Sequence, residues 1–117
     1  MNPLILPSKP PDKNYLLRLL NGNTEMMDVV LYEIYNNLPK CVSEIDLSLK
    51  TNDSFGVVTY ATRAKSAFLL INEEKLALAF SNIEDLARKG EMTHAKNTFT
   101  GVFNTTLSCI SDIKELV

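Results

Sequence analysis

Apolar residues from residue 12 onward recur mostly at three- and four-residue steps, the spacing of a helix with one buried side. The longest stripe starts at Met27 and ends at Leu49, which predicts a helix from about residue 23 or 24 to about residue 50. Alternating patterns typical of strands are nearly absent. The chain is therefore predicted to be all-α.

Polar residues and glycines divide the rest of the chain into further helices. The helix that ends near residue 50 is followed by residues 51–54, which are rich in capping residues and open the next helix. Asn72 is expected to end that helix and to cap the one after it. Gly90 is expected to end that helix in turn. The remaining predicted helices cover about residues 13–20, 54–71, 73–89 and 91–116.

Prolines mark one end of the chain and one position inside a helix. Four of the five prolines lie within residues 1–11, which predicts an extended, proline-rich tail followed by a single domain over residues 12–117. Pro39 falls inside the longest apolar stripe, where it leaves the Tyr35 carbonyl without its helical donor. We expect a kink there rather than a break.

Short connectors between long amphipathic helices favour antiparallel neighbours. The expected architecture is an antiparallel up-down-up-down four-helix bundle, capped by the short N-terminal helix. With 117 residues, the chain has the size of one domain.

The helix predicted from about residue 54 to residue 71 has two contrasting sides. With Thr62 as zero and about 100° per residue, one arc is wholly apolar or aromatic and is expected to be buried: Val57, Tyr60, Ala61, Ala64, Ala67, Phe68 and Ile71. Thr62 is expected at the centre of the opposite arc, facing solvent. That arc comprises Val58, Thr59, Thr62, Lys65, Ser66 and Leu69. Pattern alone favours a simple solvated face.

Composition narrows the function classes. The net charge is −2 and there is no basic arm, which argues against nucleic acid as a partner. The N-terminus lacks the pattern of a signal peptide, and no apolar run approaches the ~20 residues of a membrane span. We therefore expect a cytoplasmic protein that does not associate with membranes.

Few residues suggest catalytic or metal chemistry. Cys41 and Cys109 each fall in an apolar helical stripe, which predicts two buried, reduced thiols. His94, the only histidine, is expected at the surface near the start of the last helix. There is no Cys/His cluster, nucleotide-binding loop, catalytic triad or paired-carboxylate site. We therefore expect no metal, no cofactor and no enzymatic activity of its own.

Residues 61–68, Ala-Thr-Arg-Ala-Lys-Ser-Ala-Phe, resemble the signature of histidine phosphotransfer (HPt) domains from two-component phosphorelays. That signature has alanine, histidine, any residue, leucine and lysine, followed by small residues. Residues 19–26, 38–39 and 85–91 resemble other landmarks of the family in the same order. The resemblance covers about residues 12–117 and implies a four-helix bundle that carries signals to and from receiver domains.

The resemblance places Thr62 where the family has its phosphoryl-accepting histidine. A threonine hydroxyl has a much higher pKa than an imidazole, and a phosphothreonine ester is too stable to pass its phosphoryl group on. The resemblance therefore implies a docking module for response-regulator receiver domains or a hybrid sensor kinase. Its expected binding surface, the Thr62 face, comprises Val58, Thr59, Thr62, Arg63, Lys65, Ser66 and Leu69.

Two other interpretations stay open. The chain could be a histidine-deficient version of an active phosphotransfer protein, in which Lys65 would steady the phosphoryl group. Alternatively, it is a helical adaptor or dimerisation module unrelated to phosphorelay, since exposed aliphatic residues such as Val58 and Leu69 often mark interfaces.

Overall fold

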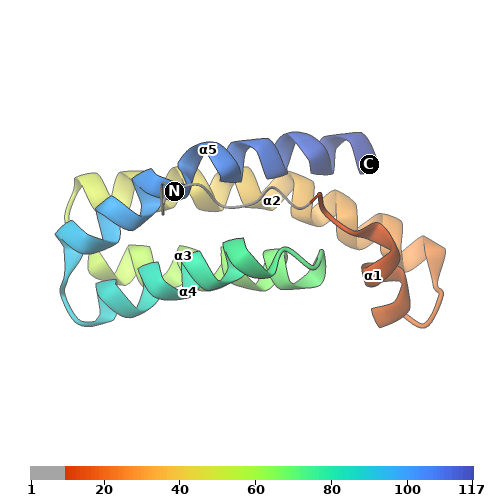
Figure 1. Cartoon of the computed structure of the whole chain (residues 1–117), viewed down its shortest axis with the longest axis horizontal. Coiled ribbons are helices and arrows are strands. Elements are labelled where there is room, and N and C mark those ends of the chain that lie inside the picture. Colours follow the sequence, from red (N-terminus) through yellow and green to blue (C-terminus); the bar gives the residue numbers. More distant parts are fainter. Residues whose placement is uncertain (1–9) are drawn as a thin grey trace, which may run out of the picture.

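The computed structural model describes residues 10–117, and within that range it contains five α-helices and no strand (Figure 1). The all-α prediction is confirmed. The tail predicted for residues 1–11 lies mostly outside the described residues; Pro10 and Pro11 are not helical. The helices are α1 (Lys13–Leu19), α2 (Thr24–Lys50), α3 (Ser54–Leu70), α4 (Glu74–Arg88) and α5 (Met92–Leu116).

The four long helices form a bundle. Figure 1 shows α2 beside α5 in one layer and α3 beside α4 in the other. Each long helix packs against the next one in the chain, and α5 packs back against α2. The short α1 lies at one end of the bundle, where it contacts α2.

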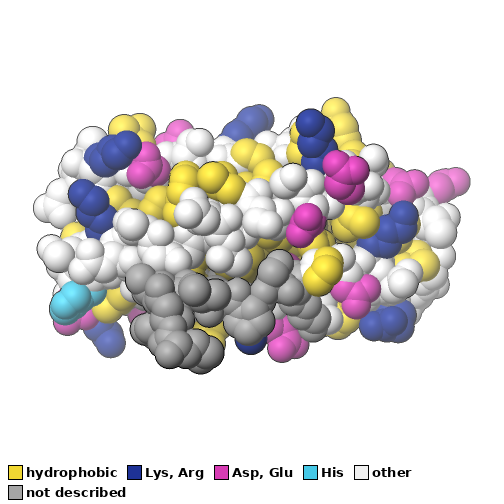
Figure 2. Space-filling model, turned by 45° about the horizontal axis from the view of Figure 1, so that its top comes forward, with side chains coloured by type: hydrophobic (Ala, Val, Ile, Leu, Met, Phe, Trp, Pro, Cys, Tyr) yellow, Lys and Arg dark blue, Asp and Glu magenta, His cyan; other side chains and the backbone are white. Residues whose placement is uncertain are grey.

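The centre of the bundle is built around aromatic side chains from three helices. The rings of Phe68 on α3 and Phe80 on α4 lie 5.1 Å apart, and the Phe80 ring lies 6.4 Å from that of Phe99 on α5. Phe68 and Phe80 are fully buried. Charged side chains of both signs are interspersed on the face shown in Figure 2, with apolar side chains between them.

The predicted buried arc of α3 is confirmed at its centre. Val57, Ala61, Ala64, Phe68 and Ile71 are each 0% exposed. The two remaining members of that arc, at positions 60 and 67, are half-buried. α2 continues through Pro39 as one helix, so the proline does not break it.

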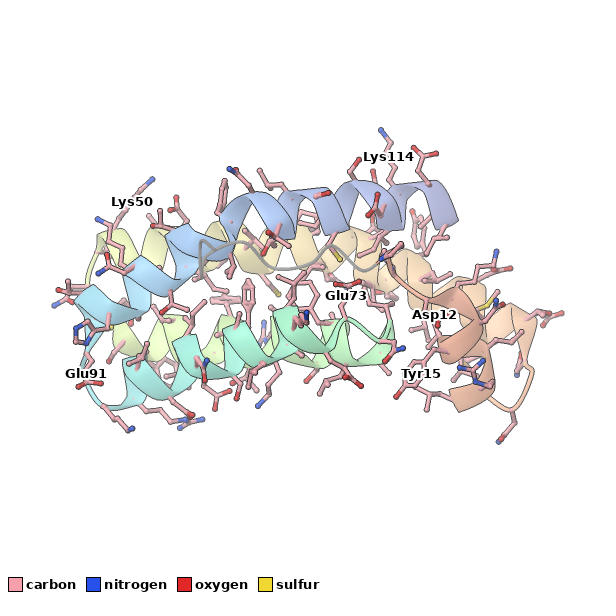
Figure 3. The ribbon with its side chains drawn as sticks, viewed as in Figure 1. Asp12, Tyr15, Lys50, Glu73, Glu91 and Lys114 are labelled. Atoms are coloured by element: carbon pink, nitrogen blue, oxygen red, sulfur yellow. The ribbon has the colours of Figure 1, made fainter. Side chains whose placement is uncertain are left out.

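Three helices begin at a side chain that caps them. Asp12, Asn23 and Asp53 each accept a hydrogen bond of 3.0 Å from the backbone N–H three residues further on. Figure 3 labels the first of these residues and its partner Tyr15 at the start of α1. Such caps satisfy N–H groups that have no partner inside the helix. Of the two residues predicted for the N-cap of α2, Asn23 and Thr24, the structure shows Asn23.

The prediction that Asn72 caps α4 is wrong. Asn72 has φ 60°, and the N-cap of α4 is Glu73, which makes no side-chain capping bond. Asn72 instead follows the end of α3 in the left-handed conformation. The N–H of Glu73 donates to the Phe68 carbonyl at 2.8 Å, and that of Asn72 to the Leu69 carbonyl at 3.3 Å. This is the hydrogen-bond pattern of a Schellman C-cap. Its left-handed position is usually occupied by glycine and sometimes, as here, by asparagine. Gly90, with φ 76°, ends α4 as predicted.

Gly56 allows α3 to begin close to α2. A methyl group at this position would collide with the Ser48 hydroxyl oxygen and lie 2.7 Å from an Asp53 carboxylate oxygen. We therefore expect Gly56→Ala to lower the free energy of unfolding by about 1–2 kcal/mol, although alanine favours helices. Urea unfolding measures the change. The double variant Ser48→Ala/Gly56→Ala should regain part of the loss, and no regain would show that the collision with Ser48 is not its cause.

Candidate functional site

Thr62 lies at the middle of α3, and its hydroxyl is tied to α4. The hydroxyl oxygen lies 2.7 Å from Glu84 Oε1 and 2.8 Å from the Val58 carbonyl oxygen. Because a hydroxyl has one proton, it donates to only one of these acceptors at a time, and a charged carboxylate is the stronger acceptor. Thr62 is half-buried rather than fully exposed as the sequence pattern predicted.

The solvent-facing side of α3 is centred nearer to Ser66 than to Thr62. Arg63, Ser66 and Leu69 are exposed, whereas the rest of the Thr62 face is half-buried: Val58, Thr59, Thr62 and Lys65. At about 100° per residue, Ser66 lies roughly 40° from Thr62 around the helix. The difference arises because α4 packs along the side of α3 that carries Thr62 and Lys65.

Glu84 joins three side chains of this site and was not foreseen from the sequence. Its Oε1 accepts from the Thr62 hydroxyl and, at 3.4 Å, from Lys65 Nζ. Its Oε2 accepts from Arg88 Nε at 3.1 Å, and Arg88 Nη2 forms an ion pair with the same oxygen at 3.1 Å. Glu84 is only 8% exposed. Thr62, Lys65, Glu84 and Arg88 together form what we call the Glu84 cluster.

The cluster holds Glu84 in its charged form. The hydrogen bond from Thr62 is the largest cause lowering the pKa of the Glu84 carboxyl, and the neighbouring Arg88 and Lys65 lower it further. Burial acts in the opposite direction but is the weaker influence. A carboxylate with a lowered pKa is a weak base. Glu84 is therefore suited to orienting the side chain at position 62 rather than to removing its proton.

A groove between α2 and α3 adjoins the Thr62 face. It has a volume of about 680 Å³, and Ile34, Leu38 and Ala67 contribute to its apolar lining. Arg63 and Ser66, both predicted binding residues, also line it. The Arg63 guanidinium lies 5.2 Å from the centre of the Tyr60 ring, which places its charge beside the groove.

Both cysteines are buried and free, as predicted. Burial raises the pKa of the Cys109 thiol to about 12, and the negative charges of Glu73 and Asp112 add to the effect. Burial also raises the pKa of the Cys41 thiol, although Arg63 opposes the shift. Thiols with raised pKa values carry little thiolate and react slowly.

The remaining predicted features lie apart from this site. His94 is exposed in the first turn of α5. Across residues 10–117, no group of histidine, cysteine and carboxylate side chains is arranged to hold a metal ion. No helix in the described part of the chain has the length and apolar character needed to cross a membrane.

Comparison with protein families, with curated proteins and with solved structures gives no match for this chain.

Proposed function

We propose that this chain is an HPt-like signalling module that acts in the cytoplasm and docks receiver domains or a hybrid sensor kinase. The observation that carries the proposal is the arrangement around position 62. A side chain at mid-helix is held by Glu84 from the neighbouring helix, with Lys65 bonded to the same carboxylate oxygen. A phosphoryl-accepting histidine at this position would have the Glu84 carboxylate as a hydrogen-bond acceptor, with the Lys65 cation bonded to that same carboxylate.

The proposed bundle is antiparallel, with up-down-up-down connectivity. The connectors between the long helices leave only residues 51–53, 71–73 and 89–91 outside the helices. Connectors of this length favour neighbours that run in opposite directions. Under this topology the middle of α3 lies away from both ends of the bundle, where a partner has lateral access to it.

Threonine at position 62 makes the module a docking protein rather than a carrier. Phosphotransfer from an aspartyl phosphate needs a nucleophile that is neutral and reactive near pH 7, which histidine is and threonine is not. The weakly basic Glu84 does not compensate, because its pKa is lowered by the bond that it receives from Thr62. The chain would bind its partners and compete with, or scaffold, active phosphotransfer proteins.

The proposed docking surface combines charge and apolar area. Arg63 and Lys65 supply positive charge, whereas Leu69, 49% exposed, supplies apolar contact area. The small side chains of Thr59 and Ser66 are half-buried and exposed, respectively. A surface with positive charge and apolar area suits the acidic rim and apolar contacts expected of a receiver domain.

Charge reversal at Lys65 tests the proposal. We expect Lys65→Glu to weaken binding to a receiver domain by about tenfold or more, because the variant replaces the cation that balances Glu84 on the docking surface by an anion, which repels an acidic partner. Isothermal titration calorimetry against receiver domains of the source organism measures the change. Circular dichroism should show little loss of helicity.

Lys50→Glu is the matched control. Lys50 is the last residue of α2, lies outside the Thr62 face and forms an ion pair with Asp46 of its own helix at 2.8 Å. Figure 3 labels it near one end of the bundle. Lys50→Glu changes the net charge by the same amount as Lys65→Glu but lies outside the proposed docking surface. Its effect on the affinity for the receiver domain should therefore stay within about twofold. Equal affinity of Lys65→Glu and the unmodified chain would contradict docking through this surface.

The same geometry favours a second candidate, a phosphotransfer protein represented by a histidine-deficient variant. Glu84 and Lys65 keep positions that would serve a histidine at residue 62.

A further inference from the structure

The cations nearest to Thr62 are already paired with an anion. Lys65 Nζ lies 3.4 Å from Glu84 Oε1, and Arg88 donates from Nε to Oε2, which it also meets with Nη2 in an ion pair. The Lys65 side chain is 29% exposed and the Glu84 side chain 11% exposed. Ion pairs shielded from water to this degree are weakened less by salt than fully exposed pairs. Turning Lys65 outward would leave a largely buried carboxylate with one partner fewer, which is costly. The Arg88 side chain is 57% exposed but is likewise committed to Oε2 of this carboxylate.

The charged atom closest to the Thr62 hydroxyl belongs to that anion. Glu84 Oε1 lies 2.7 Å from the hydroxyl oxygen, while Arg88 pairs with the other carboxylate oxygen. A dianionic phosphoryl group brought to position 62 by a docked partner would therefore meet a carboxylate within a few ångströms. Like charges at such a separation repel strongly in a partly desolvated interface. A partner with an unmodified aspartate would bring less negative charge to the same point.

We propose that Glu84 makes the Thr62 face selective for the unphosphorylated form of its receiver partner. This inference rests on the proposed docking function and adds to it the state of the partner that is bound. In such a module, Thr62 cannot accept a phosphoryl group, and Glu84 disfavours binding of the phosphorylated receiver that would donate it. The protein would sequester idle receivers and release them when they become phosphorylated.

Glu84→Gln separates the charge of this residue from its position. A glutamine carbonyl can still accept from the Thr62 hydroxyl, and the side chain keeps its size. The substitution removes the negative charge and releases Lys65 and Arg88 to face a docked anion. Asp85→Asn is the matched control, because it makes the same change of charge one residue further along α4 at an exposed position outside the Glu84 cluster.

The experiment compares the dissociation constants of one receiver domain in two forms, unmodified and with beryllium trifluoride bound at its acceptor aspartate as a phosphoryl mimic. The unmodified chain should bind the plain receiver more tightly than the beryllium trifluoride form. Glu84→Gln should shift that preference by about tenfold toward the mimic, and Asp85→Asn by less than about twofold.

Each outcome decides a different point. Tighter binding of the mimic by the unmodified chain, or the same preference in Glu84→Gln as in the unmodified chain, overturns the selectivity but leaves docking intact. Binding of neither form by any receiver of the source organism overturns the docking function and the selectivity together. Thermal unfolding of both variants confirms that the compared proteins are folded.

Discussion

Replacing Phe68 with alanine is expected to lower the free energy of unfolding by about 3–5 kcal/mol, the cost typical of truncating a large aromatic residue in a core. Phe68 is 0% exposed, and its ring lies 5.1 Å from that of Phe80. The substitution removes apolar burial and the contact between the rings, and it leaves a cavity between α3 and α4. Since the net stability of a domain is about 5–15 kcal/mol, the loss should be large in urea or thermal unfolding.

Phe55→Ala provides a control on the same helix. Phe55 is 79% exposed, so its truncation should change the free energy of unfolding by no more than about 0.5 kcal/mol. Similar losses for the two variants would show that the aromatic core described for α3 and α4 is wrong. A small loss for Phe68→Ala would carry the same meaning.

Thr62→His is expected to convert the chain into a phosphoryl acceptor. An imidazole is nucleophilic near pH 7, and Glu84 is placed to accept a ring N–H and orient the ring. Lys65 bonds to the same carboxylate and lies on the same side of α3. Incubation with a receiver labelled at its aspartyl phosphate should transfer label to the variant slowly, because Glu84 disfavours docking of the phosphorylated receiver without preventing it, against no transfer to the original chain. The label should be lost in acid, as expected for a phosphohistidine.

Ser66→His tests whether position matters. It places a histidine one turn further along α3, at an exposed residue outside the Glu84 cluster, so we expect far less label. Equal uptake by the two variants would show that Glu84 and Lys65 do not define the site. If Thr62→His binds the receiver but takes up no label, the geometry at position 62 is unsuited to transfer, and the histidine-deficient interpretation fails.

The sequence predicted the helices well because their ends are encoded locally. Asn23 caps α2, and the predicted end at residue 50 matches Lys50. The buried arc of α3 followed from helical periodicity, since five of its members are fully buried. The error at Asn72 has a local cause as well: asparagine favours both N-caps and left-handed C-caps, and sequence does not distinguish the two roles.

The site was predicted less completely because it depends on how two helices are placed against each other. Periodicity assigns Thr62 to one side of α3, but it does not show which side chain of α4 lies opposite. The local signal for Glu84 was its position between the buried residues Ile83 and Ala87, followed by Arg88 four residues on. A carboxylate on an otherwise apolar side of a helix needs a hydrogen-bond or ionic partner. Which residue of α3 is that partner depends on how α3 and α4 pack, and the sequence does not show it.

The position of Thr62 within α3 has a kinetic consequence. Eight residues of the helix precede it and eight follow it, so it is far from the ends at which helices fray. A partner that binds here meets a backbone that is already ordered, and association carries no entropic penalty for folding the recognition element. The association rate of such a partner should then be limited by diffusion and orientation rather than by folding of this chain.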